Sequence, residues 1–532
     1  MWVLVISACI CGLLLYYKLC SPLKYWSEKN VPHPTPSLIV GNLGPAVTKK
    51  ETFNKLLQKI CLKYDNHRYF GFYQFSKPSL VILDRKLIKE IFIKSFDHFT
   101  DHDDFLPKGT DTFWKKGLFS RKGEDWHDMR TTLSPAFTSR KMKAMFHLVT
   151  ECSERFVNYY VKKGATISLE VMDFFTKFDN DVIASCTFGI NCDSLENENN
   201  EFHVMAKEAF TFTGLKSLKF FGNALSPTIS RLFRVKMFSD EVRDFFMRVT
   251  KETISYREKT GLCRPDVMHL LIEAQKGRLK DEDEDNDDDK AISGFVRIDK
   301  SYSMKRNHSK KIPLTDEDIA GQALIFFFGS YDTVSLALSH TVYELVANPN
   351  VQEKLIKEID YTLNECNSKI TYEALFQMKY LDMVISETLR LWAPPPTLDR
   401  ICVKPFVIEP TLPNEKPLLI EPGVEVIVPV YAWHRNPKYF KNPDKFDPER
   451  FSDKNKESIK SFTYFPFGIG PRHCIGIRFA LLVMKIMMVN LLTKFQIIPT
   501  EKTVIPFEQS KNSLLLRSMH GYWFGLKPRT KI

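Results

Sequence analysis

Helical periodicity is the feature that most constrains the fold of this 532-residue chain. Apolar residues recur at spacings of three and four, the pattern of a helix with one buried face, in four stretches: 54–64, 141–160, 171–188 and 241–259. Period-two alternation, which predicts strands, is confined to short pieces at 78–84, 424–432 and 520–526. We therefore predict a mainly α protein with small β-sheets, of the α+β class.

The N-terminus carries an apolar run from Met1 to Tyr17, followed by Lys18, Lys24 and Lys29. A membrane span needs about 17–25 residues. A cleaved secretory peptide would carry its positive charge before the apolar run, so the pattern favours an uncleaved anchor with the remainder of the chain in the cytosol. Three prolines between residues 32 and 36 then stiffen the chain. We expect a transmembrane anchor at 1–20, a basic, proline-rich hinge at 21–45 and a single large domain at 46–532.

Charge is distributed unevenly along this domain. The acidic block 280–290 continues into a polar, basic stretch, and we expect 280–311 to form an exposed charged loop. The formal net charge of +11 favours an acidic partner: nucleic acid, anionic lipid or an acidic protein. In 212–238 five basic residues interleave with aromatic ones, which suits a membrane surface or an ordinary solvated pair of helices. Because the apolar N-terminus already predicts a bilayer, lipid is favoured over nucleic acid.

A second informative segment is 315–346, which is apolar on every side, as expected for a fully buried helix. Thr315 and Asp318 form a capping arrangement at its start. Its middle carries the small and polar residues Gly329, Ser330, Asp332 and Thr333. A helix end at Gly329 is the alternative, but the apolar pattern continues beyond it, so we predict a functional kink.

The chain has 11 cysteines and no C-x-x-C pair, which argues against a zinc site of the common spacing. One cysteine, Cys474, lies in the glycine-rich stretch "YFPFGIGPRHCIG", whose spacing fits neither phosphate-binding template. Its thiol is a candidate nucleophile, with His473 adjacent, or a metal ligand. Metal ligation is favoured because backbone amides can donate to the sulfur, Phe467 can shield it and Arg472 offers positive charge.

Two further groupings of charged residues are spaced for contact. Glu387 and Arg390 lie at i and i+3 on one helix face, where a carboxylate–guanidinium pair can form, and Arg450 could join the same carboxylate. Trp126 and Arg130, at i and i+4, present an indole donor and a cation on one face. That second pair suits an anionic group.

The segment "FGIGPRHCIG" resembles the Phe-x-x-Gly-x-Arg-x-Cys-x-Gly heme-binding signature of the cytochrome P-450 superfamily at every fixed position. Other marks of the family follow in the same order: Trp-x-x-x-Arg at Trp126, acid-threonine at Asp332, Glu-x-x-Arg at Glu387 and Pro-Glu-Arg-Phe at Pro448. The resemblance covers essentially the whole chain. It looks most like the microsomal animal group that includes insect detoxification enzymes.

The resemblance implies the cytochrome P-450 fold, with 46–532 as a single catalytic domain, and a role for each matching residue. Cys474 would be the axial ligand of the iron in heme b. Asp332 and Thr333 would be catalytic and relay protons. Glu387, Arg390 and Arg450 would form a structural network. The cofactor-binding residues would be Trp126, Arg130, Arg400 and Arg472 at the heme propionates, with Phe467 and Cys474.

Two departures from the family pattern qualify these roles. Ser330 stands where relatives usually have glycine, so we expect one extra hydroxymethyl group in the oxygen groove. His102 stands where some relatives place an arginine toward a propionate, with Asp103 beside it, and is left out of the expected site.

The implied function is that of a monooxygenase (EC 1.14.14) of the endoplasmic reticulum membrane, which inserts one oxygen atom into a lipophilic xenobiotic, lipid or hormone. The chain has no flavin or nicotinamide motif, so electrons from NADPH would arrive through NADPH-cytochrome reductase, with a small heme protein as a second donor. A heme-thiolate isomerase or dehydratase without a reductase and a non-catalytic heme sensor are the alternatives, and Thr333 argues against both. No nucleic acid partner is expected.

The resemblance also suggests which residues line the substrate pocket. Ordinary core packing is the alternative for each of the phenylalanines among them. The set is Phe105, Phe210, Phe212, Phe326, Phe327, Thr397, Leu398 and Leu514.

Overall fold

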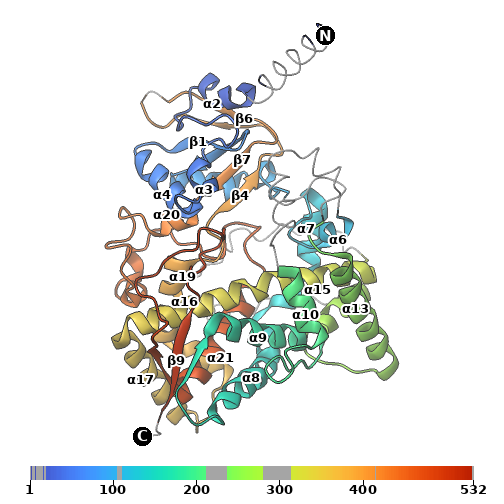
Figure 1. Ribbon diagram of the computed structural model, residues 1–532. Coiled ribbons are helices and arrows are strands. Elements are labelled where there is room, and N and C mark those ends of the chain that lie inside the picture. The colour runs from blue at the N-terminus through green and yellow to red at the C-terminus, as the bar shows by residue number, and fades with distance from the viewer. Residues whose placement is uncertain are drawn as a thin grey trace.

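The computed structural model describes residues 20–104, 111–210, 236–278, 313–413 and 415–529, with three isolated positions before residue 20. Most strands lie at one end of the molecule, whereas the long helices lie at the other end together with the sheet that contains Trp523–Pro528 (Figure 1). The described N-terminal residues lie at the strand end, and the C-terminal ones at the helical end.

The predicted helical stretches are confirmed. They correspond to α4 (Phe53–Lys63), α8 (Ser139–Val161), α9 (Val171–Ile183) with the wider turn η5 (Ala184–Phe188), and α13 (Asp240–Thr260). The other long helices are α7 (Gly123–Leu133), α10 (Glu201–Phe210), α14 (Val267–Gln275), α15 (Asp316–Tyr331), α16 (Thr333–Ala347), α17 (Pro349–Glu365), α19 (Lys379–Trp392) and α21 (Ile477–Lys494). Short helical turns are η1 (Ser21–Lys24), α2 (Tyr25–Glu28), α3 (Gly44–Val47), α5 (Arg85–Lys89), η2 (Glu90–Lys94), η3 (Phe96–His98), α6 (Thr112–Lys116), η4 (Ser134–Phe137), α18 (Tyr372–Gln377), α20 (Val430–His434), η9 (Pro448–Phe451) and η10 (Lys456–Ser458).

The strands form three small sheets, which confirms the predicted class. The largest has the order β1-β2-β7-β4, in which only the β2–β7 pair is parallel. The predicted strand 424–432 is too long: β7 ends at Val428 because Pro429 cannot donate to the ladder, and α20 begins at Val430. The strands are β1 (Tyr69–Gln74), β2 (Lys77–Ile82), β3 (Ile167–Glu170), β4 (Leu398–Ile401), β5 (Phe406–Ile408), β6 (Leu418–Ile420), β7 (Glu425–Val428), β8 (Phe495–Pro499) and β9 (Trp523–Pro528).

The start of the described chain packs onto the largest sheet. Trp26 is fully buried, and its indole N–H donates to the Phe72 carbonyl at 3.3 Å. Gly71 leaves room for this ring, because a Cβ there would lie 2.3 Å from the indole. Nearly all of the expected anchor, most of 212–238 and the loop 280–311 lie outside the described residues. Within the described part, no helix is long and apolar enough to cross a membrane.

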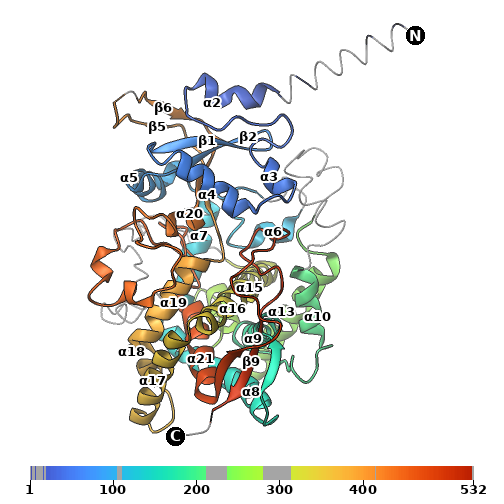
Figure 2. The ribbon, with the colours of Figure 1, turned by 60° about the vertical axis from the view of Figure 1, so that its left-hand side comes forward.

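A helix break lies where the kink is predicted. The capping box of Thr315 and Asp318 starts α15, which ends at Tyr331, and α16 begins at Thr333. Asp332 lies at the break. Figures 1 and 2 both place the two halves between the sheet above and α8, α9 and α21 below, so the break lies deep in the molecule.

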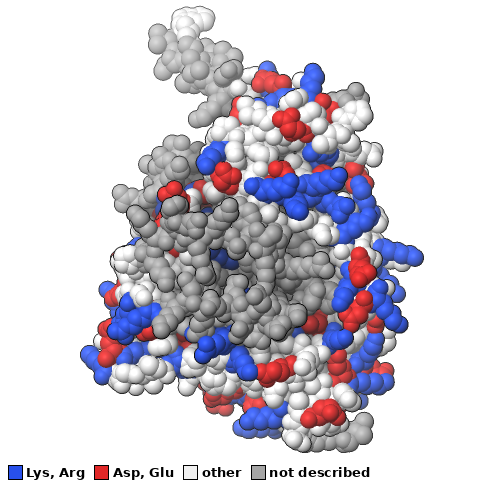
Figure 3. All heavy atoms as spheres, turned by 180° about the vertical axis from the view of Figure 1, so that it is seen from behind, with Lys and Arg blue, Asp and Glu red and all other residues white. Residues whose placement is uncertain are grey.

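The surface charges are of mixed sign where the structure describes them. On the face drawn in Figure 3, acidic and basic side chains alternate around the undescribed region, with one continuous run of Lys and Arg beside it. On this face, Lys and Arg side chains therefore gather in one area instead of being spread evenly.

Candidate cofactor site

The loop that carries Cys474 runs from Tyr464 to Gly476 and leads into α21. Gly468 and Gly470 have φ of 84° and 71°, a region that disfavours other residues. A Cβ on Gly470 would lie 2.0 Å from the Phe92 carbonyl oxygen, so only glycine lets the loop approach η2. The Cys474 amide closes the loop by donating to the Phe467 carbonyl at 2.9 Å.

The Cys474 side chain is accessible, yet its thiol is surrounded by enough protein that desolvation raises its pKa. The Gly476 amide donates a hydrogen bond to the sulfur, and this bond and the Arg130 charge act in the opposite direction on the pKa. Amide donation to the sulfur was predicted from the glycines. The thiol of Cys474 is thus both accessible and partly desolvated.

His473 does not act as a base toward this thiol. Its Nδ1 donates to the Gly470 carbonyl at 2.8 Å, and its Nε2 lies 3.3 Å from an Arg130 nitrogen. Burial lowers the His473 pKa to about 4, so the ring is neutral and ties the loop to α7.

Three buried arginines gather near this loop from separate elements. Arg130 on α7 donates to the His473 carbonyl at 3.1 Å. Arg400 on β4 donates to the Ile469 carbonyl at 3.3 Å. Arg472 donates to the carbonyls of residues 100, 118, 119 and 121 and lies 4.2 Å above the Trp126 ring. Trp126, predicted from its spacing to Arg130, is thus part of the same group.

The electrostatics of this cluster favour an added anion. Burial lowers the pKa of Arg130 and Arg400 to about 10, and that of Arg472 to about 9 with a further contribution from Arg400. Two carboxylates, Asp101 and Asp399, raise the pKa of these guanidiniums. The buried Nε of Arg400 has no hydrogen-bond partner in the described part of the chain. Buried donors without partners are costly, so an anionic acceptor fits here.

The residue left out of the prediction, His102, belongs to this cluster. Its Nδ1 lies 3.0 Å from the Asp399 carboxylate and 3.5 Å from an Arg400 nitrogen, and its ring stacks on Phe119. Burial lowers its pKa, and Asp399 opposes that effect. The pair His102 and Asp399 lies 297 positions apart, so no local sequence signal marks it.

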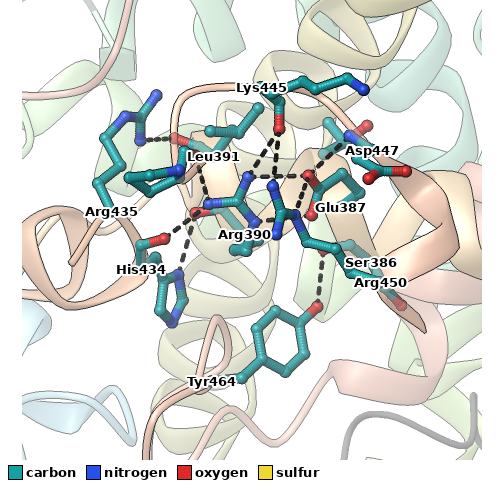
Figure 4. Close-up of polar contacts among 12 residues, drawn as sticks. Ser386, Glu387, Arg390, Leu391, His434, Arg435, Lys445, Asp447, Arg450 and Tyr464 are labelled. Carbon is teal, nitrogen blue, oxygen red and sulfur yellow. Dashed lines mark hydrogen bonds and ion pairs between the residues drawn. The ribbon is translucent and has the colours of Figure 1, made fainter. Parts of the chain in front are cut away.

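Behind the cysteine loop lies the predicted ion-pair network (Figure 4). Arg390 donates to both oxygens of Glu387 at 2.7 and 2.8 Å, and Arg450 adds a bond of 3.2 Å to the same carboxylate. Glu387 and Arg390 are fully buried. His434 links this network to the loop, because its Nε2 accepts from the Phe465 amide at 3.0 Å while its Nδ1 donates to the Arg390 carbonyl.

The helix break presents the second predicted group. Thr333 donates its hydroxyl to the Gly329 carbonyl at 2.6 Å, and the Asp332 carboxylate pairs with Arg517. Gly329 is exposed in the last turn of α15, and a Cβ there would meet nothing within 4 Å. The break therefore borders open space on the side of Gly329.

The expectation for Ser330 is wrong. Its hydroxyl bonds to the buried Asp179 carboxylate of α9, at 3.3 and 3.2 Å from the two oxygens, so it is directed at α9 rather than into an oxygen groove. The residues involved are 151 positions apart, and the sequence carries no signal for their contact.

The expected pocket walls are only partly supported. Phe105 and Phe212 lie outside the described residues. Phe327 is fully buried among other rings and is core, and Leu514 is 53% exposed. Phe210 stacks on Phe328 of α15 with ring centroids 4.9 Å apart. The remaining three are partly exposed: Phe326, Thr397 and Leu398.

Comparison with known proteins explains why the thiol and the buried arginines lie together. A family model described as Cytochrome P450 matches residues 31–523. The chain belongs to the cytochrome P450 family. It is 40% identical to cytochrome P450 9e2 of Blattella germanica over 522 residues, 95% of this chain and 94% of that protein. It is 34% identical to cytochrome P450 6k1 of Blattella germanica, covering 97% and 95% of the two chains, and 34% identical to cytochrome P450 9c1 of Drosophila melanogaster, covering 97% of each.

Membership in the cytochrome P450 family makes the chain a heme-dependent monooxygenase with heme b as cofactor, a redox partner and a lipophilic substrate. The site fits this group. Heme b needs one iron ligand from the protein and acceptors for two propionates, and the structure supplies an amide-lined thiol and a cluster of three guanidiniums with an unpartnered donor.

Proposed function

We propose that the protein is a monooxygenase of the endoplasmic reticulum membrane that takes electrons from NADPH through NADPH-cytochrome reductase, or a small heme donor, and oxidises lipophilic xenobiotics or endogenous lipids and hormones. The observation that carries the proposal is the accessible, amide-bonded thiol of Cys474 beside the three buried arginines. In this arrangement residues 1–20 are the anchor, 21–45 the hinge and 46–532 the catalytic domain, with 280–311 as an exposed loop.

On the cysteine side, Cys474 would hold the iron as its thiolate. Bound heme would supply oxygen activation, and the Cys474 thiolate would promote it by donating electron density. The chain's own contribution is to hold the sulfur in place and to offset part of its desolvation, because the Gly476 amide and the Arg130 charge both lower the pKa that burial raises. Phe467 completes the loop through its carbonyl.

At the propionate edge, Arg130, Arg400 and Arg472 with Trp126 would bind the carboxylates. The Nε of Arg400 is the clearest candidate donor, since it is buried and has no partner in the described chain. Most Arg472 donors already bond to carbonyls, so its role toward a propionate would be chiefly its charge.

On the other side, Asp332 and Thr333 would hold and move protons. Thr333 keeps its hydroxyl beside the open space at Gly329 by donating to that residue's carbonyl. Asp332 pairs with the half-exposed Arg517, which places the carboxylate between the helix break and the surface. A proton relay needs groups that bridge solvent and the reacting atoms, and this pair is placed to do so.

The test is NADPH-driven turnover of the full-length protein with and without reductase. We expect Thr333→Ala to lower product formation about 100-fold or more, the range typical of proton-transfer residues, and to divert electrons to hydrogen peroxide. Thr341→Ala is the matched control, because Thr341 makes the same bond to the Ala337 carbonyl on α16. Product formed equally without reductase would instead support an isomerase or dehydratase.

A further inference from the structure

The buried carboxylate of Asp179 reaches the helix break from a neighbouring helix. Asp179 on α9 is fully buried, and within the described chain its carboxylate has one hydrogen-bond partner, the hydroxyl of Ser330. Both carboxylate oxygens lie within 3.3 Å of this hydroxyl. The bond therefore joins α9 to α15 through side chains alone.

The position of Ser330 makes this bond consequential. Ser330 follows Gly329, whose carbonyl accepts from Thr333, and precedes the break at Asp332 by two residues. At a helix break, backbone hydrogen bonds no longer fix the orientation of the two helix halves relative to each other. Helix α9 packs against both α15 and α16, so a bond from α9 to Ser330 can fix the segment that the ladder does not.

Two apolar side chains would fill this part of the interface between α9 and α15 at a lower free-energy cost. Burying a carboxylate is expensive unless it is well paired, and desolvation raises the Asp179 pKa to about 7, with Ser330 acting in the opposite direction. No basic side chain bonds to it within the described residues. Buried polar groups of this kind are retained in some proteins because they specify one conformation.

We propose that Asp179 is a positioning residue: its hydrogen bond to Ser330 fixes the broken segment Gly329–Thr333 and thereby the direction of the Thr333 hydroxyl. The inference rests on the proposed role of Thr333 in proton transfer. It gives Ser330, which replaces the glycine usual in relatives, a partner outside the oxygen groove.

The experiment compares Ser330→Ala, Asp179→Ala, the double variant and Asp179→Asn in the holoenzyme. Amide hydrogen exchange over residues 329–336 reports the segment directly and needs no turnover. The fraction of electrons lost to hydrogen peroxide reports Thr333. Ser339→Ala is the matched control, since Ser339 is a buried hydroxyl on α16 that also contacts α9, through Met172.

We expect each alanine variant to speed exchange in this segment roughly 2- to 10-fold, the factor that corresponds to one ordinary hydrogen bond. Each should also raise the peroxide fraction, the double variant should match the singles, and Asp179→Asn, which can still accept, should stay near wild type. Should Asp179→Ala not fold, Ser330→Ala against Asp179→Asn decides the question.

Exchange in Ser330→Ala equal to wild type, effects that multiply in the double variant, or an Asp179→Asn variant as fast as Ser330→Ala would each overturn the proposal. Failure of the proposed function gives a different result: the wild type itself would make no product with NADPH and reductase, while the exchange comparison would still decide whether Asp179 holds the segment.

Discussion

The loop that carries Cys474 and the helix break that carries Thr333 differ in how much room they leave. Beside the loop, a Cβ on Gly470 would lie 2.0 Å from a backbone oxygen, whereas a Cβ on Gly329 would meet nothing within 4 Å. The loop is backed by a carboxylate with two arginine partners, and the break by one hydroxyl–carboxylate bond and one ion pair with a half-exposed arginine. The loop is tightly packed, and the break borders open space.

The largest effect should come from breaking the network behind the loop. Glu387→Ala leaves Arg390 buried without its carboxylate, which should cost about 3–5 kcal/mol of unfolding free energy and most heme incorporation. Urea denaturation and heme content measure both. Glu353→Ala, which breaks the exposed pair with Lys357, should leave the unfolding free energy close to that of the wild type, because solvent screens this pair. Equal losses in the two variants would contradict a special role for the buried network.

A methyl group at the tightest glycine should have the next largest effect. Gly470→Ala forces a left-handed residue and a clash with the Phe92 carbonyl, and we expect a loss of about 2–4 kcal/mol. Gly277→Ala, with similar φ and open space, should cost only the backbone part, about 1–2 kcal/mol. Thermal and urea unfolding would measure the two losses of stability. A Gly470→Ala variant as stable as Gly277→Ala would mean that the loop shifts to accommodate the methyl group.

At the helix break, the stability of the wild type and that of Asp179→Asn should depend differently on pH, because the amide does not titrate. The pKa of Asp179 is raised from 3.8 to about 7 in the folded protein, so between these values the folded state holds a proton that the unfolded chain releases. The unfolding free energy of the wild type therefore falls as pH rises from about 4 to 7. Asp179→Asn should therefore match wild type near pH 4 and become more stable by on the order of 4 kcal/mol above pH 7. A stability difference that does not vary between pH 4 and 8 would contradict the desolvated carboxyl.

The smallest change in stability should come from filling the open space. Gly329→Ala adds a methyl group where nothing lies within 4 Å, in a helical backbone, so unfolding free energy should stay equal or rise by up to about 1 kcal/mol. Binding of carbon monoxide and of lipophilic ligands, followed spectroscopically, should weaken despite intact folding. Unchanged binding would show that this space lies away from the reactants.

The sequence predicted most contacts between residues close together in the chain and missed contacts between residues far apart in it. The capping box at Thr315, the polar break at Asp332 and the i,i+3 pair at Glu387 are neighbours in sequence, so their spacing carries the information. The partners Asp179 of Ser330, Arg517 of Asp332 and Asp399 of His102 lie 151, 185 and 297 positions away. Such contacts depend on how helices and sheet pack, for which a single sequence has no periodic signal.

Ligation of heme iron by the Cys474 thiolate can be read from the spectrum of the reduced, carbon-monoxide-treated protein. The wild type should show the far-red-shifted Soret band of thiolate ligation, and Cys474→Ser should abolish it. Cys402→Ser, which changes a buried thiol in the strand region, should keep the band in whatever folded protein remains. An unshifted band in the wild type, or a normal shifted band in Cys474→Ser, would contradict the account.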